Sequence, residues 1–429
     1  MKQFRIFGFV TGLIAIIAGP AAAAPVVTVV TTNGSGVFAL NDAGHVAYKG
    51  VEGGDFQVYL YKNGASAKIT ANNNANKSFI DYVKINNNDQ IVWNQYDYSG
   101  DTLQVNLYLY SGGTIKKINT PIGTTANYCI EPQLNINGTV VWRQYSTADG
   151  VNNGSEIFLY NGSTIRVTTD ANKDESPSIN NIDLVAWTTD RRSASDWDQR
   201  INEFNCGDVS TICYGAGTGS FAPQIQADNS VFYVIYNSAN TVSYYSLNLL
   251  ANFQTRQIAL GSFGNRPFSS CNGKAVFSLA NKQMYLFNGS DTARISTSPY
   301  DNNYPCVNGS GHAAWLESDA SGNFDRVVYY NAASVDSVCA FGAYSSPLIN
   351  AGDDIVWSND GSTIYLAHAS TGVMPTVKAG SNRATAPARR AGVLMRSDSR
   401  MTIMSDVRGR KIQPGTGVRA AGVFVGVPK

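Results

Sequence analysis

A large aromatic residue recurs along most of the chain, and each copy ends a short apolar run. Successive copies are separated by 45, 49, 45, 46, 44, 38 and 42 residues. The copies are Tyr48, Trp93, Trp142, Trp187, Tyr233, Phe277, Trp315 and Trp357. A short polar residue, usually asparagine, stands seven positions before each of them: Asn41, Asn86, Asn135, Asn180, Gln226, Ser270, Asn308 and Asn350. Such a repeat decides the fold class, because every copy must form the same supersecondary unit and bury its apolar face against its neighbours.

The rest of each repeat indicates short β-strands separated by tight turns. After the aromatic residue comes a variable stretch, then a strand such as Val58–Tyr61 or Ile157–Tyr160, then a turn such as Asn161-Gly162 and a further short strand. β-branched and aromatic runs bounded by turn residues are typical of strands, and Asn-Gly is typical of two-residue hairpins. In the last six repeats a proline stands ten positions before the aromatic residue: Pro132, Pro177, Pro223, Pro267, Pro305 and Pro347. With the strand between this position and the asparagine, each repeat contains four strands.

Four strands in about 40 to 45 residues, repeated, is the period of a β-propeller blade. We therefore predict an all-β fold, a β-propeller over residues 24–376 with eight blades. Seven blades remain the alternative, if the first and last repeats are partial and pair across the ring closure. Residues 26–32 are placed to supply the outer strand of the last blade. A β-sandwich would not repeat one motif in register, and leucine-rich, ankyrin or tetratricopeptide repeats need helical patterns that the sequence lacks.

One repeat carries a motif that resembles a known family. Residues 167–180 contain Thr168 and Thr169, a few polar residues, Asp174-Glu-Ser-Pro177 before a strand, and then Asn180. In this the chain resembles the bacterial TolB-like and PD40-like β-propeller repeats. The resemblance implies the propeller fold over most of the chain. It does not imply one function, because such repeats occur in translocation accessories, peptidase propellers and polysaccharide lyases.

The first residues read as an export signal. Lys2 and Arg5 precede an apolar run at 6–18, and small residues follow at 21–24. The apolar run is shorter than the roughly 20 residues that span a bilayer. We therefore predict a signal peptide over residues 1–23, cleaved after Ala23, no transmembrane segment, and a location outside the cell, at the cell surface or in the periplasm.

The six cysteines fit an oxidising compartment. Cys206 and Cys213 enclose a polar turn between two strand-like runs, so we predict a disulfide bond between them. The pairing of the other four cannot be chosen from sequence: Cys129, Cys271, Cys306 and Cys339.

The charge divides the chain into two parts. Residues 378–429 hold eleven Lys or Arg and two Asp, a balance of +9, and the signal adds +2; subtracting both from the total of +1 leaves about −10 for the predicted propeller. An acidic propeller excludes bulk attraction to nucleic acid. We predict a linker at 377–391 and a basic tail at 392–429, in which short strands around 393–396, 401–412 and 421–425 resemble type IX secretion sorting domains, with Phe424 in place of the usual tyrosine. The alternatives are a basic tail that contacts a surface, or a disordered extension.

Loop lengths distinguish the two faces of the predicted propeller. Connections after the first and third strands are mostly tight turns, whereas those after the second and fourth strands are long and varied, at 94–104, 119–131, 143–155, 188–199, 296–304 and 316–325. Function concentrates in loops on a rigid scaffold, so we expect the ligand on the long-loop face. The candidate binding residues are Trp197, Asp198, Arg191, Arg192, Arg143, Tyr96, Tyr98, Tyr145, Tyr300, Tyr304 and Glu317.

Aromatic planes beside arginine and amide groups suit stacking and hydrogen bonding to sugars or peptides. Trp197 beside Asp198 is the leading candidate, because a Trp in a charged, Ser-rich loop has no strand to belong to. The alternative for each tyrosine is that it packs within its own loop.

Motifs for catalysis are few. The sequence lacks G-x-S-x-G, H-E-x-x-H and phosphate-binding glycine loops, and His45, His312 and His368 fall at structural positions. Asp198 and Glu317 remain as a carboxylate pair for glycoside hydrolysis. We expect no cofactor, with calcium at the oxygen-rich stretches 170–175 and 319–325 as an alternative, although both lack the glycine and glutamate of an EF-hand.

Taken together, these features favour an exported, monomeric, non-catalytic propeller that binds a polysaccharide or a protein at the cell envelope. The alternatives are a propeller lyase or glycosidase, and a structural envelope or secretion-accessory component.

Overall fold

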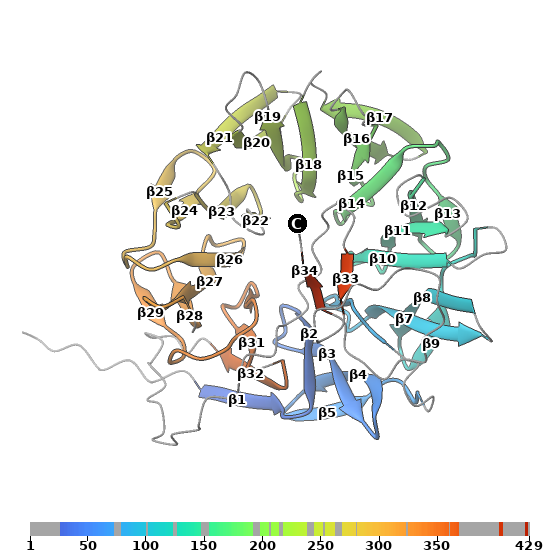
Figure 1. Ribbon diagram of the computed structural model, residues 1–429, viewed down its shortest axis with the longest axis horizontal. Coiled ribbons are helices and arrows are strands. Elements are labelled where there is room, and N and C mark those ends of the chain that lie inside the picture. Colours follow the sequence, from blue (N-terminus) through green and yellow to red (C-terminus); the bar gives the residue numbers. More distant parts are fainter. Residues whose placement is uncertain are drawn as a thin grey trace, which may run out of the picture. The chain divides into compact units, whose positions relative to one another are not determined.

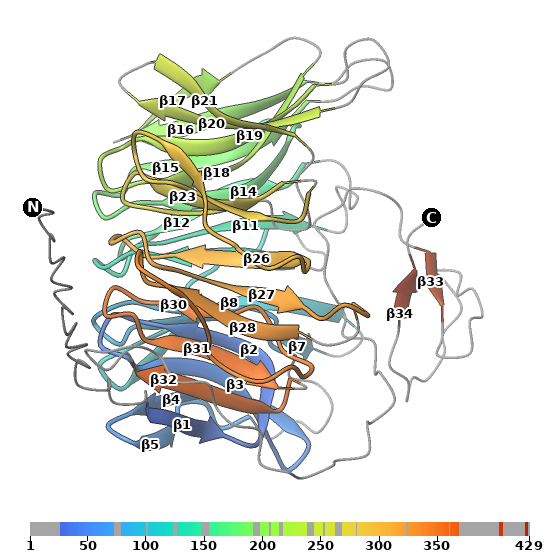
Figure 2. The ribbon, with the colours of Figure 1, turned by 90° about the vertical axis from the view of Figure 1, so that its left-hand side faces the viewer.

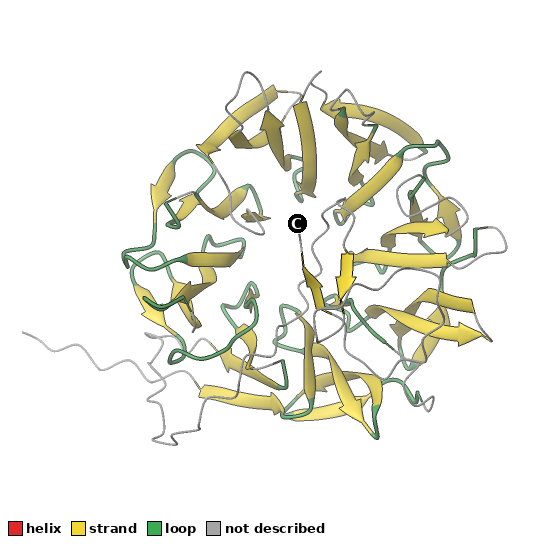
Figure 3. Ribbon diagram, in the orientation of Figure 1, coloured by secondary structure: helices red, strands yellow, loops and turns green. Residues whose placement is uncertain are grey.

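The computed structural model describes residues 26–72, 79–99, 102–122, 127–146, 154–191, 198–205, 207–213, 218–237, 244–251, 254–261, 268–279, 281–322, 325–359, 361–368, 403–405 and 425–427. Throughout these residues the regular structure is β-strand, and they contain no α-helix (Figure 3). The chain divides into two compact parts, Met1–Lys378 and Ala379–Lys429.

In the first part the described strands form eight four-stranded antiparallel units, numbered here in chain order. Units 1 to 4, innermost strand first, are β2 (Gly34–Leu40), β3 (Val46–Glu52), β4 (Asp55–Lys62), β5 (Ala65–Lys68); β6 (Val83–Ile85), β7 (Ile91–Ser99), β8 (Thr102–Ser111), β9 (Thr114–Lys117); β10 (Asn127–Leu134), β11 (Val140–Ser146), β12 (Glu156–Tyr160), β13 (Thr164–Arg166); and β14 (Lys173–Ile179), β15 (Val185–Asp190), β16 (Gln199–Asn205), β17 (Asp208–Cys213).

Units 5 to 8 follow around the ring (Figure 1). They are β18 (Thr218–Ile225), β19 (Val231–Asn237), β20 (Tyr244–Ala251), β21 (Gln254–Gly261); β22 (Phe268–Cys271), β23 (Lys274–Ser278), β24 (Met284–Phe287), β25 (Thr292–Arg294); β26 (Asn302–Val307), β27 (Ala313–Ser318), β28 (Asp325–Tyr330), β29 (Val335–Ser337); and β30 (Leu348–Ile349), β31 (Ile355–Asn359), β32 (Thr363–His368) with β1 (Val26–Thr31). Parallel bridges from β8 to β10 and from β16 to β18 link units 2 with 3 and 4 with 5.

The ring is closed by strands from opposite ends of this part of the chain. β1 pairs antiparallel with β32 and so becomes the outermost strand of unit 8, with Val27 opposite Ala367. The prediction for residues 26–32 is therefore confirmed. Because the first strand lies in the last unit, the ring cannot open without breaking a sheet.

The recurring aromatic residues form the core of the units. Each lies in the second strand of its unit and is at most 3% exposed. Where the residue opposite it in the third strand is also aromatic, the rings stack: centroids lie 5.2 Å apart for Tyr48 and Tyr59, and 5.5 Å apart for Trp357 and Tyr365. Core clusters join residues of neighbouring units, so each sheet is covered on both faces, which explains the nearly continuous apolar runs (Figure 2).

The prolines mark bulges in the innermost strands. Glu131, Ser176, Ala222 and Tyr304 each precede a proline and have φ between 53° and 56°. The strand register shifts at each of these positions. A bulge leaves a residue outside the ladder, and there the missing N–H of proline costs no hydrogen bond.

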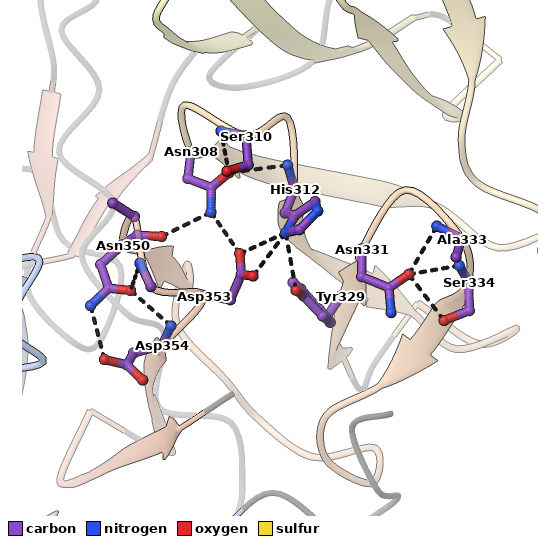
Figure 4. Close-up of polar contacts among 12 residues, drawn as sticks. Asn308, Ser310, His312, Tyr329, Asn331, Ala333, Ser334, Asn350, Asp353 and Asp354 are labelled. Carbon is purple, nitrogen blue, oxygen red and sulfur yellow. Dashed lines mark hydrogen bonds and ion pairs between the residues drawn. The ribbon is translucent and has the colours of Figure 1, made fainter. Parts of the chain in front are cut away.

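The asparagines build the turns between the first and second strands and also join neighbouring units. In unit 7, Asn308 Oδ1 accepts hydrogen bonds from the backbone N–H groups of Ser310 and His312, at 3.1 Å each, while Asn308 Nδ2 donates to Asn350 O of unit 8 at 2.9 Å (Figure 4). Asn350 Nδ2 in turn donates to Asn41 O of unit 1 at 2.9 Å. The same link joins units 1 to 5 in sequence.

The exceptions in the repeat use other donors. Gln226 Nε2 donates to Ser270 Oγ at 2.8 Å, and Lys274 Nζ donates to Gly309 O at 2.7 Å. Side chains therefore tie each described unit to the next along this face.

The described structure does not show the predicted disulfide. Cys213 is a free thiol, and its Sγ lies 3.4 Å from Ser220 Oγ. In the β16–β17 hairpin, Asn205 pairs with Asp208 at the turn. Cys213 stands opposite Ile201 at the other end of the hairpin. Cys206 lies outside the described residues. The other four cysteines are also free thiols: Cys129, Cys271, Cys306 and Cys339.

In the second part of the chain the structure describes two strands. β33 (Ile403–Ser405) pairs antiparallel with β34 (Val425–Val427), and Met404 stands opposite Gly426. The predicted signal at 1–23, the linker at 377–391 and most of the sorting-domain motif, Phe424 included, lie outside the described residues. Among the residues that are described, no helix is long and apolar enough to cross a membrane.

Candidate functional site

The antiparallel order of each unit places its connections on two faces. Turns from first to second and from third to fourth strand lie on one face, the tight-turn face; connections from second to third strand and from unit to unit lie on the other, the long-loop face. On the long-loop face the stretch expected as a loop at 94–104 is instead an extended hairpin, in which β7 and β8 pair from Ile91 opposite Tyr110 to Ser99 opposite Thr102. Hydrophobic and polar residues alternate at 95–99 and 102–107, and pairing with a long partner strand extends the ladder.

Five of the eleven predicted binding residues lie at strand ends that reach this face. Tyr96 and Tyr98 are on β7, Arg143 and Tyr145 on β11, and Glu317 on β27. They were expected in loops because the sequence becomes polar after each core aromatic residue. These strands continue three to six residues beyond that point, so these side chains are positioned by sheet pairing.

The first group on the long-loop face is an aromatic run of Phe56, Phe79 and Tyr96, from units 1 and 2. Ring centroids lie 5.4 Å apart for Phe56 and Phe79, and 6.0 Å apart for Phe79 and Tyr96, the second pair edge to face. The backbone N–H of Tyr96 donates to Phe79 O at 2.9 Å, which fixes the connection before β6 against β7. Phe79 is 44% exposed, so the run presents an open aromatic surface.

Charged groups underlie this run. Lys49 Nζ lies 4.8 Å from the centroid of the Phe56 ring, and burial lowers the pKa of Lys49 although Asp81 opposes the change. Burial raises the pKa of Tyr96, and its hydrogen bond to Asp81 and the nearby Tyr145 phenol add to the effect. Tyr96 of unit 2 and Tyr145 of unit 3 are thus neighbours, as the sequence grouped them.

Arg143 continues the group into units 3 and 4. It is 7% exposed, and its guanidinium carbon lies 5.6 Å from the centroid of Tyr145, whose ring stacks on Tyr128 at 5.0 Å. Its Nη1 lies 3.6 Å from Glu131 Oε1 and 3.5 Å from Glu175 Oε2. Two carboxylates therefore already neutralise Arg143, and its role is to hold Tyr145 and the neighbouring strands in place.

A second group lies on the same face at unit 7. Arg326 forms an ion pair through Nε and Nη2 with Glu317 Oε1, and its guanidinium carbon lies 4.8 Å over the Phe341 ring. Tyr300 meets Phe341 edge to face at 6.1 Å, and Phe341 is 40% exposed. The structure thus brings the predicted Tyr300 and Glu317 together, while Tyr304 lies in the β26 bulge and packs against the core between units 7 and 8.

The remaining predicted residues belong to the loop between β15 and β16. Arg200 holds Asp198 through two hydrogen bonds of 2.8 Å, and the exposed Arg191 closes the loop through its backbone N–H to Asp198 O at 2.8 Å. Trp197 and Arg192 lie outside the described residues, and so does the side chain of Tyr98.

The sequence reading missed the aromatic residues that the structure exposes most. Phe79 and Phe341 each follow the outermost strand of a unit, in the connection to the next unit. The same connections also hold buried apolar residues, Ile80 and Val338, so the sequence contains no signal that distinguishes the exposed phenylalanines.

The oxygen-rich stretches make other contacts. Glu175 pairs with Lys173 Nζ at 2.6 Å, and Asp319 Oδ1 accepts from the backbone N–H of Ser321 at 3.1 Å. Within the described residues there is no group of three or more His, Cys, Asp or Glu side chains that could hold a metal ion.

All three histidines lie on the tight-turn face, beside aspartates. His45 Nδ1 lies 2.7 Å from Asp89 of unit 2, and His312 Nδ1 lies 2.8 Å from Asp353 of unit 8. His368 Nδ1 lies 3.0 Å from Asp354. These pairs sit at or beside the unit junctions around the ring closure, away from the long-loop face.

Comparison with known proteins gives the fold. No family model matches the sequence, and no curated protein does. Oligogalacturonate lyase from Vibrio parahaemolyticus is similar in structure, with a TM-score of 0.51 and 12% identity over 82% of this chain and 98% of that one. The fold is a β-propeller. The prediction drawn from the resemblance to TolB-like and PD40-like propellers is therefore confirmed for the fold.

Two further solved structures are similar at a lower level. An oligogalacturonate lyase in complex with manganese has a TM-score of 0.49 and 12% identity, over 80% of this chain and 91% of that one. TolB from Acinetobacter baumannii has a TM-score of 0.34 and 13% identity, over 66% and 80%. At such identities the likeness concerns the fold alone, and the propeller's activity must be argued from its own residues.

Proposed function

We propose that this β-propeller is an exported, non-catalytic protein that binds a polysaccharide or a protein at the cell envelope through its long-loop face. The observation that carries the proposal is the aromatic run of Phe56, Phe79 and Tyr96 with its open phenylalanine. Aromatic rings are the side chains that contribute most to binding at such surfaces, both for peptides and for the apolar faces of sugars. Sheet pairing holds Phe56 and Tyr96, and the hydrogen bond from Tyr96 N to Phe79 O holds the third residue, so the run loses little entropy on binding.

The carboxylates considered for catalysis support a binding role. Asp198 is held by Arg200, and Glu317 by Arg326. In both cases a guanidinium occupies the carboxylate that a glycosidase would need as its acid or nucleophile. The proposal accordingly involves no metal or cofactor.

A glycan array and a binding assay with envelope fractions, using the full chain, test this function. Phe79→Ala should weaken retention by about tenfold or more, since removing a central aromatic residue from an interface typically costs over 1 kcal/mol. The matched control is Ile182→Ala, which removes a side chain of 68% exposure from the tight-turn face. Absence of any ligand, or equal binding by wild type and Phe79→Ala, would contradict the proposal. Turnover of a polysaccharide would favour the enzymatic alternative.

A further inference from the structure

Two junctions of the propeller share one hydrogen-bond framework. Between units 3 and 4 (the 3–4 junction), Arg166 Nη2 donates to Glu156 Oε1 at 2.8 Å and Thr168 Oγ1 donates to Glu156 Oε2 at 2.7 Å. Between units 6 and 7 (the 6–7 junction), the matching arginine and hydroxyl, from Arg294 and Ser296, donate to Gln283 Oε1 at 2.6 and 2.8 Å. The two junctions therefore differ here by an acid in place of an amide.

The same difference recurs at the first residues of the next unit. Trp187 Nε1 donates to Asp174 Oδ1 at 3.0 Å in unit 4, and Trp315 Nε1 donates to Asn302 Oδ1 at 2.6 Å in unit 7. Both acceptors stand thirteen residues before their tryptophan. Their backbones are held alike, because Asp174 N donates to Ser155 O at 2.8 Å and Asn302 N donates to Lys282 O at 3.0 Å.

The two sites differ in the second polar atom of the acceptor side chain, which is Nδ2 in Asn302 and Oδ2 in Asp174. Asn302 Nδ2 donates to Tyr300 O at 2.7 Å and to Lys282 O at 2.9 Å, so its amide fastens the start of β26 to unit 6. Asp174 is 1% exposed, and its Oδ2 is buried without a hydrogen-bond partner in the described structure. An ionised carboxylate has no donor, so it cannot make the bond that the amide makes.

We propose that Asp174 is a proton-operated latch: in its protonated form Oδ2–H donates to a backbone carbonyl as Asn302 Nδ2 does, and loss of the proton releases the start of β14 from unit 3. By the equivalence of the two sites, the carbonyls available are those of Ser155 and Asn172. Protonation supplies the missing donor and removes the cost of burying an unpaired charge.

The groups around Asp174 favour the protonated form near neutral pH. Burial raises the pKa of Asp174 to about 7, and the charges of Asp170 and Glu156 add to the rise. The hydrogen bond from Thr189 and the nearby Thr168 hydroxyl act in the opposite direction. Arg166 also faces the junction, but Glu156 pairs with it.

The sign of the pH dependence follows. An acid whose pKa is raised by folding contributes stability that is fully present below its unfolded pKa of about 3.9. That contribution is lost as the pH rises to about 7, the pKa of Asp174 in the fold.

The protonation state of Asp174 should also affect ligand binding at the long-loop face, an inference that rests on the proposed function. Glu175, the next residue of β14, pairs with Arg143, which supports Tyr145. Release of β14 at high pH would loosen that support, so we expect ligand binding to weaken as the pH rises.

Thermal unfolding of the full chain tests the latch without any ligand. From about pH 5 to about pH 8, the Tm of wild type should fall by several degrees more than that of Asp174→Asn, whose amide stays neutral and can donate as Asn302 does. The reciprocal change, Asn302→Asp, should add a fall of similar size. The three histidines are present in every variant, so any contribution from them cancels in the comparison. Equal slopes for wild type and Asp174→Asn would overturn the proposal.

Two further measurements keep the test independent of variant folding and of ligand. In the infrared spectrum of the wild type, the C=O band of a protonated carboxyl should persist at about pH 6, where exposed carboxyls are ionised. Amide hydrogen exchange at 172–176, corrected for its intrinsic pH dependence, should speed up on going to pH 8 in wild type and not in Asp174→Asn. Absence of the infrared band, or the same exchange in both proteins, contradicts the latch, whereas failure of the proposed function would show only as absence of ligand binding.

Discussion

The 3–4 and 6–7 junctions are two versions of one structure. In each, an arginine and a hydroxyl donate hydrogen bonds to one side chain at the third strand, the third-strand acceptor. A buried tryptophan donates to a second side chain at the first strand of the next unit, the first-strand acceptor. One uses Glu156 and Asp174, the other Gln283 and Asn302. Acceptor oxygens can thus be exchanged between acid and amide without changing the framework, while the remaining atom decides whether the junction depends on pH.

In either junction, replacing the tryptophan should cause the largest loss of stability. Trp187→Ala and Trp315→Ala should each destabilise the protein by about 3 to 5 kcal/mol, because each empties a fully buried site. Trp187→Ala also removes a donor from Asp174, so its loss should be larger at about pH 8 than at about pH 5. Denaturant unfolding at the two pH values measures both effects, and Trp315→Ala serves as the control without a carboxyl.

A smaller change compares the first-strand acceptors directly. Asn302→Ala removes an amide that makes two backbone hydrogen bonds, for an expected loss of about 1 to 3 kcal/mol. Asp174→Ala should cost less at about pH 8, because it also removes an unpaired buried charge. At about pH 5 the two losses should converge. If Asp174→Ala is the more damaging of the two at the higher pH, Oδ2 has a partner and the comparison fails.

The smallest effect should come from the third-strand acceptor. Glu156→Gln gives the 3–4 junction the amide of the 6–7 junction, and the arginine and threonine keep an acceptor. The ion pair joins the partly exposed Arg166 to the buried Glu156, and the amide keeps the acceptor oxygen that serves both donors in the 6–7 junction, so stability should change little. Removing the negative charge beside Asp174 should lower the pKa of that carboxyl, so the fall of Tm with pH should begin at lower pH. An unchanged Tm profile would show that Glu156 does not act on Asp174.

Much of the fold follows from the sequence because the repeat indicates which residues form the core and which form the turns. The aromatic residues, the asparagine turns and the closing strand β1 could be assigned from spacing alone. Strand length could not: β7 and β8 extend beyond the core aromatic residue because they pair with each other, and pairing is a tertiary property. The position of Cys213 could not be assigned either, because the register of the β16–β17 hairpin places it opposite Ile201.

The candidate site was found in part. Tyr96, Tyr145 and Arg143 were grouped from sequence, and the structure brings them together through sheet pairing. Phe79 was missed, because its exposure depends on how the connection before β6 lies against Tyr96. The ion pair of Glu317 with Arg326 could not be foreseen, since Arg326 comes from the returning strand, whereas Arg200 stands only two residues after Asp198.

The hydrogen bond from Asn350 to Asn41 spans 309 residues of chain. During synthesis, the turn of unit 1 and the strand β1 must therefore wait for almost the whole propeller to be made before their partners exist. β1 contains only valine and threonine, without the charges that protect other sheet edges, so in this interval it is open to wrong pairing. The order of synthesis therefore constrains assembly of the ring, because β1 must stay unpaired until β32 has been made.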